Sequence, residues 1–152
     1  MSLQYESAEF SEELKKRINR SSEFREKIGH ANLKTLIIVK DVPSATFASF
    51  VEGVLEERNH IPLSQIEEYR KKADFTIEIP TYELSVDVAS GKKSLESLYL
   101  GGMLKMEGSV FKALQYRDVF AIVAKITADL VNQSTVPLKE DFVKMLQKRG
   151  LL

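Results

Sequence analysis

The chain has 152 residues, with 22 Lys and Arg against 22 Asp and Glu, two His and no Cys. Its length fits one domain, and its composition of 43% hydrophobic and 29% charged residues is that of an ordinary globular protein. The absence of cysteine excludes a disulfide scaffold, a thiolate zinc site and a cysteine nucleophile. Nucleic-acid binders neutralise phosphates with an excess of Lys and Arg. This chain has a net charge of zero and no such excess, so we expect no nucleic acid as a partner.

No segment reaches the roughly 18 consecutive apolar residues of a membrane-spanning helix, so we expect no integral membrane insertion. The most apolar region, residues 119–131, is interrupted by Lys125, Thr127 and Asp129. The first six residues lack the basic start and apolar run of a signal peptide. The sequence therefore predicts a cytoplasmic protein.

The N-terminal region, residues 7–30, is predicted to be helical. Phe10, Leu14 and Ile18 recur at a spacing of four, and Gly29 is a natural stop. The charges on the opposite side are of mixed sign, whereas helices that lie on membranes are usually basic. The pattern favours a helix that packs on a core over one that lies on a membrane.

The central region, residues 33–116, is predicted to hold the sheet and several short helices. Residues 33–42 are predicted to form a strand, and because residues 36–39, Leu-Ile-Ile-Val, are β-branched and apolar on both faces, we expect it to be buried on both sides. A second strand, residues 46–55, follows after a short turn, so the two are expected to pair antiparallel. Residues 73–79 alternate apolar and polar side chains, as a half-buried strand does.

The signal between residues 56 and 72 is mixed. Ser64 and Glu67 have the three-residue spacing of a capping box, which favours a short helix that holds Ile66 and Tyr69. Residues 61–63, Ile-Pro-Leu, are consistent with the end of a strand.

Two further short helices are expected to begin at Thr81 and Ser94, and a short strand at residues 103–107. Ser109 is a good N-cap for a helical stretch, residues 110–131, that need not be one straight helix.

The C-terminal helical extension, residues 117–152, ends in an amphipathic helix that carries Leu138, Phe142, Met145 and Leu146. The whole chain is predicted to fold as one α+β domain.

The sequence contains no recognisable catalytic or metal-binding motif. His30 and His60 belong to no metal or catalytic motif and are each interpreted as exposed loop histidines. Residues 91–94, Gly-Lys-Lys-Ser, resemble the end of a phosphate loop, but Val86 stands where the first glycine is required. We therefore expect no catalytic residue, no metal and no cofactor.

Large apolar side chains are concentrated between positions 84 and 120. They are Leu84, Val88, Leu95, Leu98, Tyr99, Leu100, Met103, Met106, Val110, Phe111, Leu114, Val119 and Phe120. Each of them alone is best explained as core packing. Together they also suit the wall of an apolar cavity, because methionine adapts to ligands of different shape and about 300–1,000 Å³ holds a lipid-sized ligand. Composition does not choose between a filled core and a cavity.

Several segments resemble the sterol carrier protein type-2 family. Residues 71–79 look like the strand entry of that family, and Ala-Ser-Gly-Lys at 89–92 stands where the family has Thr-Gly-Lys after a short helix. Residues 101–109, Gly-Gly-Met-Leu-Lys-Met-Glu-Gly-Ser, resemble the family's Gly-Lys-Leu-Lys-Ile-x-Gly-Asn strand, and a helix follows in both. The resemblance covers residues 71–116, with the order of elements in residues 24–54 also as expected.

This resemblance implies a five-stranded, mostly antiparallel sheet covered by helices, with extra C-terminal helices and an apolar tunnel between sheet and helices. Family members bind sterols, fatty acyl chains, acyl-CoA or phospholipids without covalent chemistry, and the same domain serves as an accessory or dimerisation module beside enzymes. Carried over to this chain, the lipid-binding residues are Phe75, Ile77, Leu84, Val88, Leu95, Leu98, Met103, Val110, Phe111 and Leu114. A polar head group is expected near Lys92, Lys93 or Lys105.

The chain departs from the family pattern at three places. Leu100-Gly101-Gly102 replaces the Gln that often precedes the family's strand glycine, and Phe111 replaces a small residue, which is expected to narrow or reshape the cavity. The helices of residues 119–152 extend past the usual end of the family and can either cap the tunnel or form a homodimer interface.

Three hypotheses follow. The first is non-covalent binding, with intracellular transfer, of a fatty acyl chain, acyl-CoA or sterol-like lipid. The alternative is an accessory or dimerisation module for a partner enzyme, with the tunnel collapsed around Phe111 and a C-terminal helix packed on another chain. The third and weakest is an enzyme whose carboxylate site is assembled by the fold, for instance from Glu107 and Asp118.

Overall fold

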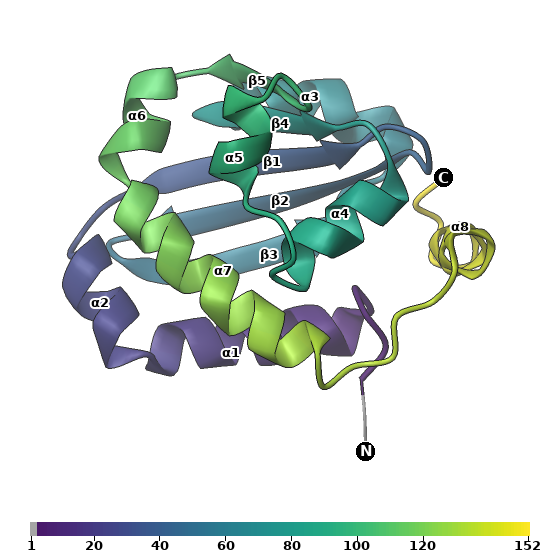
Figure 1. Cartoon of the computed structure of the whole chain (residues 1–152), viewed down its shortest axis with the longest axis horizontal. Helices are drawn as coiled ribbons and strands as arrows, with labels where there is room; N and C mark the ends of the chain where they lie inside the picture. The colour runs from purple at the N-terminus through teal and green to yellow at the C-terminus, as the bar shows by residue number, and fades with distance from the viewer. Residues whose placement is uncertain (1–2) are drawn as a thin grey trace.

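The computed structural model describes residues 3–152, and part of the N-terminal segment that argued against a signal peptide lies outside this range. The chain folds around one five-stranded sheet with the strand order β3-β2-β1-β4-β5 (Figure 1). The strands are β1 (Leu33–Val39), β2 (Ser44–Val51), β3 (Val54–His60), β4 (Phe75–Ile79) and β5 (Lys105–Gly108). The expected five-stranded α+β fold is confirmed.

The sheet is mostly antiparallel, as expected. β1 and β2 form the antiparallel pair that the short turn predicted, with Ile37 opposite Thr46. β3 extends this pair on one side, and β5 pairs antiparallel with β4 on the other. Within the five-stranded sheet, β1 and β4 run parallel, with Ile37 opposite Ile77. The chain therefore crosses from one half of the sheet to the other between β3 and β4.

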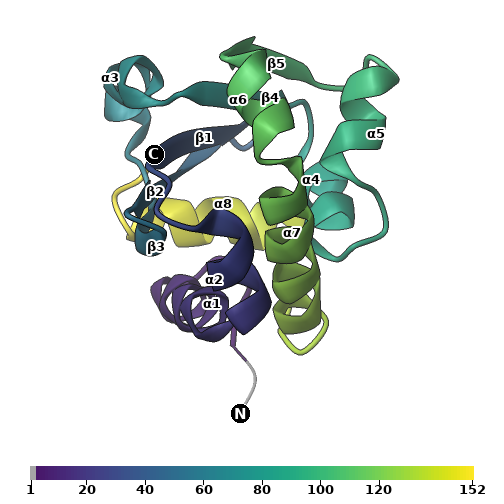
Figure 2. The ribbon, with the colours of Figure 1, turned by 90° about the vertical axis from the view of Figure 1, so that its left-hand side faces the viewer.

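Helices cover the two faces of the sheet unequally. The helical elements are α1 (Ala8–Arg20), α2 (Ser22–Ile28), η1 (Leu63–Gln65), α3 (Ile66–Lys72), α4 (Tyr82–Ala89), α5 (Leu95–Leu100), α6 (Val110–Gln115), α7 (Arg117–Val131) and α8 (Lys139–Lys148). Figure 2 shows α3 on one side of the sheet, and α4, α5 and α7 on the other. The larger part of the core lies on the face of the sheet that α4, α5 and α7 cover.

The central strand β1 is buried on both sides, as its apolar sequence predicted. Leu36 and Ile38 point to the smaller cluster under α3, together with Phe47 and Ile66. The alternate positions of β1 and β4 point to the larger cluster, which contains Leu33, Phe75, Ile77 and Ile79 and the inner faces of α1, α2, α4, α5, α7 and α8. In α1 the buried side includes Phe10, Leu14 and Ile18, so this helix packs on the core as expected.

Serine and threonine side chains begin most of the helices. The hydroxyl groups accept a hydrogen bond from the backbone N–H three residues later and so satisfy one of the free donors of the first turn. The caps of this kind are Ser7, Ser21, Thr81, Ser94 and Ser109. The helix starts predicted at the last three of these residues are confirmed.

The segment around residue 60 differs from the sequence prediction. β2 ends at Val51 instead of Leu55, and β3 follows after a two-residue turn at Glu52 and Gly53, both with positive φ. α3 forms as expected, but Gln65 stands at its N-cap and no side chain caps it, so the predicted Ser64 capping box is wrong.

His60 is buried at the end of β3, so its assignment as an exposed loop residue is wrong, whereas His30 is exposed as predicted. The reason is β3 itself: this edge strand carries Glu56, Glu57 and Arg58, and charged edge strands do not show an apolar alternation. His60 Nε2 lies 3.5 Å from a carboxylate oxygen of the buried Glu6.

The helical stretch predicted over residues 110–131 is divided into α6 and α7 at Tyr116. The final helix α8 begins after Pro137 and ends before Gly150, as predicted. Its residue Phe142 packs within 4.7 Å of the Tyr82 ring and 6.3 Å of the Tyr5 ring, measured between centroids. α8 thus uses its apolar side within its own chain.

Candidate lipid-binding surface

The structure divides the ten residues for which lipid binding was predicted into an inner and an outer group. Phe75 and Ile77 on β4, Leu84 on α4 and Leu98 on α5 are buried in the larger core cluster. Val88 and Leu95 are partly buried and pack against the same cluster. These six side chains therefore line the interior between β4, α4 and α5.

The other four predicted residues are exposed. Phe111 is 76% exposed, and Met103, Val110 and Leu114 are also exposed. Because the ring of Phe111 lies in solvent, it does not fill the space between sheet and helices, contrary to the expectation that it narrows a cavity. The predicted set runs from the core out to the surface at α6.

Two more apolar side chains join this exposed group. Leu100 is 77% exposed, and its neighbour Tyr99 is also exposed. We call the six residues on α5, α6 and the intervening loop the α5–α6 patch: Tyr99, Leu100, Met103, Val110, Phe111 and Leu114. Figures 1 and 2 both place α5, β5 and α6 at the same end of the molecule.

The shortness of α5 and α6 explains this exposure. Each has six residues, fewer than two turns, so only one or two side chains can face the core. In α5 the residue that does so is Leu98, which leaves Tyr99 and Leu100 outside. The sequence signal for this exposure is the run of three large apolar residues, 98–100, on a helix too short to bury all of them.

Polar contacts hold α6 beside the sheet. Asp74, just before β4, accepts hydrogen bonds from Lys112 Nζ of α6 and from the backbone N–H of Lys34, both at 2.8 Å. Burial would raise the pKa of Asp74, but these hydrogen bonds outweigh it, and the pKa lies below its usual value. The charged form of Asp74 therefore fixes the start of α6.

Gly108 makes the turn from β5 into α6 possible. Its φ is +93°, and a Cβ atom there would lie 2.5 Å from the carbonyl oxygen of Asp74. Only glycine accepts both this conformation and this close approach. The position of α6, and so of Phe111, depends on this residue.

One hollow lies next to the patch. It has a volume of about 240 Å³ and is lined by Lys40, Glu78, Pro80, Gly102, Met103, Leu104 and Lys105. Met103 is the only predicted lipid-binding residue in this lining. Both lysines and Glu78 make it a polar hollow at the border of an apolar surface.

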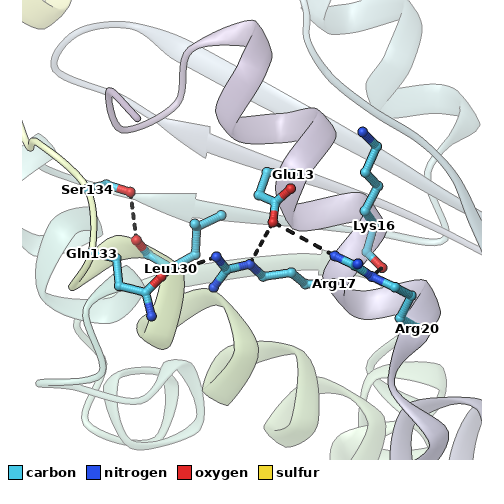
Figure 3. Close-up of polar contacts among 7 residues, drawn as sticks. All are labelled: Glu13, Lys16, Arg17, Arg20, Leu130, Gln133 and Ser134. Atoms are coloured by element: carbon cyan, nitrogen blue, oxygen red, sulfur yellow. Dashed lines mark hydrogen bonds and ion pairs between the residues drawn. The ribbon is translucent and has the colours of Figure 1, made fainter. Parts of the chain in front are cut away.

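A larger hollow of about 610 Å³ lies between α1 and the end of α7. Figure 3 shows its polar contacts: Glu13 accepts a hydrogen bond from Arg17 Nε at 2.9 Å, and Arg17 Nη2 donates to Gln133 at 3.1 Å. None of the ten predicted residues lines it. Besides Glu13 and Arg17, the charged residues Glu9, Glu12 and Lys16 line it, so it does not offer a site for hydrocarbon.

The lysines expected near a head group differ in their surroundings. Lys92 is exposed, whereas Lys93 lies 3.7 Å from the Asp87 carboxylate. Lys105 Nζ lies 3.0 Å from Glu107 and 3.7 Å from Glu78, within a cluster that also holds Arg70.

Glu107 and Asp118 are not brought together as one site. Glu107 alternates on β5 with Met106, which packs against the larger core cluster, so the Glu107 side chain lies on the α3 face with Arg70. Asp118 is in the first turn of α7, on the opposite face. In residues 3–152 no group of three or more His, Asp or Glu side chains is arranged to hold a metal ion.

Within the same range, no helix combines the length and the apolar character needed to cross a bilayer.

The sequence matches no family model, and no curated protein matches it. Among solved structures, the chain is similar to a crystal structure of sterol carrier protein 2, with 15% identity, 80% of this chain and 95% of that chain covered, and a TM-score of 0.66. A Thermus thermophilus protein, which its description suggests is a sterol carrier protein, has 15% identity, coverage of 88% and 92%, and a TM-score of 0.68.

A third structure, described as a UbiJ-SCP2 ubiquinone synthesis protein, has 16% identity, coverage of 79% and 93%, and a TM-score of 0.51. Together with the strand order and the covering helices, these similarities show that the chain has the sterol carrier protein 2 fold.

Proposed function

We propose that this chain binds a lipid non-covalently, between β4 and the helices α4 to α7, with the hydrocarbon entering at the α5–α6 patch. The observation that carries the proposal is the continuous series of apolar residues from the buried Phe75 and Ile77 to the exposed Phe111. The similarity in fold to sterol carrier protein 2 supports it.

Hydrocarbon burial supplies the driving force. Moving an alkyl chain out of water contributes about 0.8 kcal/mol for each CH₂ group, so few polar contacts are needed for firm binding. A fatty acyl chain, an acyl-CoA or a sterol-like molecule fits this description. The polar end stays at the rim, where Lys92 is exposed and free of the ion pairs that hold Lys93 and Lys105.

α5 is the element that must move. It has few neighbours: Leu98 anchors it in the core, Leu95 is partly buried, and an ion pair of 2.6 Å joins its Glu96 to Arg117 of α7. A segment with so few buried side chains opens at low cost. A displacement of α5 together with Leu98 opens the larger core cluster, to which Phe75 and Ile77 also belong, without unfolding the sheet.

Native mass spectrometry of the gently purified protein tests the proposal, together with binding of a fluorescent fatty acid and a fluorescent sterol. We expect a bound lipid mass and micromolar binding. The substitution Leu98→Asp, at the anchor of α5, is expected to reduce binding, whereas Leu63→Asp, at an exposed position beyond β3, is not. A protein that carries no lipid and takes up neither probe contradicts the proposal.

The second candidate function is an accessory module for a partner enzyme. The similarity to the UbiJ-SCP2 ubiquinone synthesis protein favours it. This candidate predicts an empty protein in the same mass spectra and no uptake of either probe. The packing of Phe142 within its own chain is a reason not to place the partner on the inner side of α8.

A further inference from the structure

Residues 3–6, the N-terminal strap, hold together parts of the chain that are far apart in the sequence. The strap runs parallel to Thr135, which donates its N–H to the Leu3 carbonyl and accepts a hydrogen bond from the Tyr5 N–H, both at 2.8 Å. The ring of Tyr5 packs on that of Phe142, with 6.3 Å between centroids. The strap therefore lies against α8 and against the segment that leads into it.

Glu6 is the last residue of the strap, and its carboxylate is buried beside two side chains of β3. One carboxylate oxygen lies 2.9 Å from Arg58 Nη1 and the other lies 3.5 Å from His60 Nε2. The backbone carbonyl of Glu6 accepts a hydrogen bond of 2.9 Å from Arg149, at the end of α8. A single residue thus ties the strap both to an edge strand and to the C-terminal segment.

Two features of this cluster favour its opening. Glu6 has a φ of +61°, a left-handed conformation that is unfavourable for a residue with a side chain. The His60 side chain is 2% exposed, and its Nδ1 atom finds no hydrogen-bond partner in the described part of the chain. Movement of the strap relieves the first and gives the second access to water. The ion pairs of Glu6 and the packing of Tyr5 oppose this movement.

We propose that the N-terminal strap is released by acid: when His60 takes up a proton, residues 3–6 leave β3 and the end of α8 while the sheet stays folded. With His60 neutral, the buried cluster holds the Glu6 carboxylate and two guanidinium groups. A proton on His60 raises this to three positive charges against one, in surroundings that water does not reach. In the released state water reaches both Glu6 and His60, so the charge on His60 is no longer costly.

Three charged groups face His60 from the elements packed around it. Burial has the largest effect on the pKa of His60 and lowers it to about 4. Glu6, on the strap, raises this pKa, whereas Arg58 of β3 and Arg149 at the end of α8 lower it. The closed strap therefore disfavours a proton that the released chain accepts at the ordinary histidine pKa of about 6.5.

His60 is the member of the cluster that titrates between pH 6.5 and 4.5. Burial raises the pKa of Tyr5 and of Tyr82, so both hydroxyl groups stay protonated. Burial also raises the pKa of Glu6, but the nearby positive charges hold it below its usual value. One proton is thus taken up on release, and the ratio of released to closed strap is expected to rise about tenfold for each pH unit lost.

The strap can leave without unravelling α1. Ser7 follows the strap and caps this helix, and its hydroxyl accepts a hydrogen bond of 3.1 Å from the Phe10 N–H. Arg58 Nη1 also donates to Ser11 Oγ at 2.8 Å, so Arg58 keeps a partner after Glu6 has moved. The change of conformation is therefore confined to the residues before Ser7.

Release of the strap has a consequence for the core. Tyr5 packs on the rings of Tyr82 in α4 and Phe142 in α8, with 6.5 and 6.3 Å between centroids. All three residues belong to the larger core cluster. Acid therefore uncovers aromatic side chains on this side of the core, a property that goes beyond the proposed function and does not require lipid binding.

Amide hydrogen exchange of the full chain, followed by NMR between pH 6.5 and 4.5 with no lipid added, tests the inference. The N–H groups of Tyr5 and Thr135 report on the strap, and those of β1, which lies between β2 and β4, report on global unfolding. After correction for the intrinsic rate at each pH, the two strap amides are expected to be less protected than β1 and to lose about tenfold in protection for each pH unit. Strap amides that exchange only together with β1, or whose protection does not change with pH, overturn the inference.

Two histidine variants assign the proton. His60→Gln is expected to remove most of this pH dependence above pH 4.5. His30→Gln is the matched control, because it removes the other histidine, which is exposed and lies 3.9 Å from Glu52. An unchanged pH dependence in His60→Gln, or a loss of it in His30→Gln, overturns the assignment.

A second pair of variants covers the case in which His60→Gln fails to fold. Glu6→Gln removes the buried charge of the strap and is expected to lower the protection of the Tyr5 and Thr135 amides about tenfold at pH 6.5, because its ion pairs are lost. Glu9→Gln removes the same charge from an exposed position of α1 and is expected to change this protection by less than about twofold. Equal effects of the two substitutions overturn the role of Glu6.

Discussion

His60 is the buried ionisable residue whose environment has the clearest measurable consequence. Its Nδ1 atom is buried and finds no hydrogen-bond partner among residues 3–152, and its Nε2 atom faces Glu6. Glu6 also pairs with Arg58 at 2.9 Å, and its carbonyl oxygen accepts a hydrogen bond from Arg149. Burial lowers the pKa of His60 to about 4, the Glu6 carboxylate opposes this, and the positive charges of Arg58 and Arg149 add to the effect of burial.

Stability is therefore expected to fall as the pH is lowered from 6.5 to 4. In this range the unfolded chain binds a proton at His60 that the folded chain does not, so protonation favours unfolding. The loss reaches roughly 2–3 kcal/mol for a pKa change of this size. Urea unfolding of the native chain and of His60→Gln at several pH values measures it.

The His60→Gln variant keeps a polar group of similar size but cannot take up the proton. Its free energy of unfolding is expected to depend much less on pH above 4.5. Below that value the dependence continues in both proteins, since burial raises the pKa of Glu6 but the nearby positive charges and the hydrogen bond from Arg58 together hold this pKa below its usual value. Parallel curves for the two proteins between pH 6.5 and 4.5 contradict the assignment to His60.

At the scale of elements, α8 shows how a C-terminal helix becomes part of the core. Phe142 belongs to an aromatic group with Tyr5 and Tyr82, and the Tyr82 hydroxyl donates a hydrogen bond to the Pro137 carbonyl that precedes the helix. Leu138, at the N-cap of α8, is exposed. The helix is therefore held on one side only.

Phe142→Ala is expected to reduce the free energy of unfolding by about 3–5 kcal/mol, the usual cost of removing a buried aromatic ring. Leu138→Ala, four residues earlier on the exposed side, is expected to change it by less than about 0.5 kcal/mol. Chemical denaturation of both variants provides the measurement. A small effect of Phe142→Ala indicates that α8 is only loosely attached and free to pack on another chain.

Three helix starts could be predicted from the sequence because they depend on local chemistry. The hydroxyl groups of Thr81, Ser94 and Ser109 cap the helices that follow them, and no distant residue is needed for this. β3 could not be predicted, because Glu56, Glu57 and Arg58 form a strand only through pairing with β2. The burial of His60 was missed for the same reason.

Periodicity predicted the inner half of the candidate site and not the outer half. Phe75, Ile77 and Leu98 lie on faces that an apolar pattern identifies, and the sheet and helices cover them. Phe111 and Leu114 lie on an equally apolar helix, but α6 is too short and too near the edge of the fold for another element to cover its outer side. Whether an apolar face is covered depends on tertiary neighbours, which a single sequence does not contain.

At the scale of the whole molecule, a bound lipid is expected to act as part of the core. A ligand at one hundred times its Kd that binds only the folded state stabilises it by about 2.7 kcal/mol. For a domain of this size that raises Tm by about 5–10 °C. Calorimetry with oleate measures the shift, and acetate, which has the same head group without the hydrocarbon, is the control.

The shift is expected to grow with the logarithm of oleate concentration and to be absent with acetate. An equal shift with both acids points to binding of the carboxylate alone. No shift with oleate argues against a hydrocarbon site for this ligand.

The aromatic group formed by Tyr5 and Phe142 joins two positions 137 residues apart, which has a consequence during synthesis. Tyr5 can make these contacts only after the ribosome has synthesised the chain through the last helix, α8. Until then the nascent chain exposes apolar side chains that are buried in the finished protein, and exposed apolar surface promotes aggregation. Nascent chains paused before residue 142 should accordingly depend on chaperones, whereas finished ones should not.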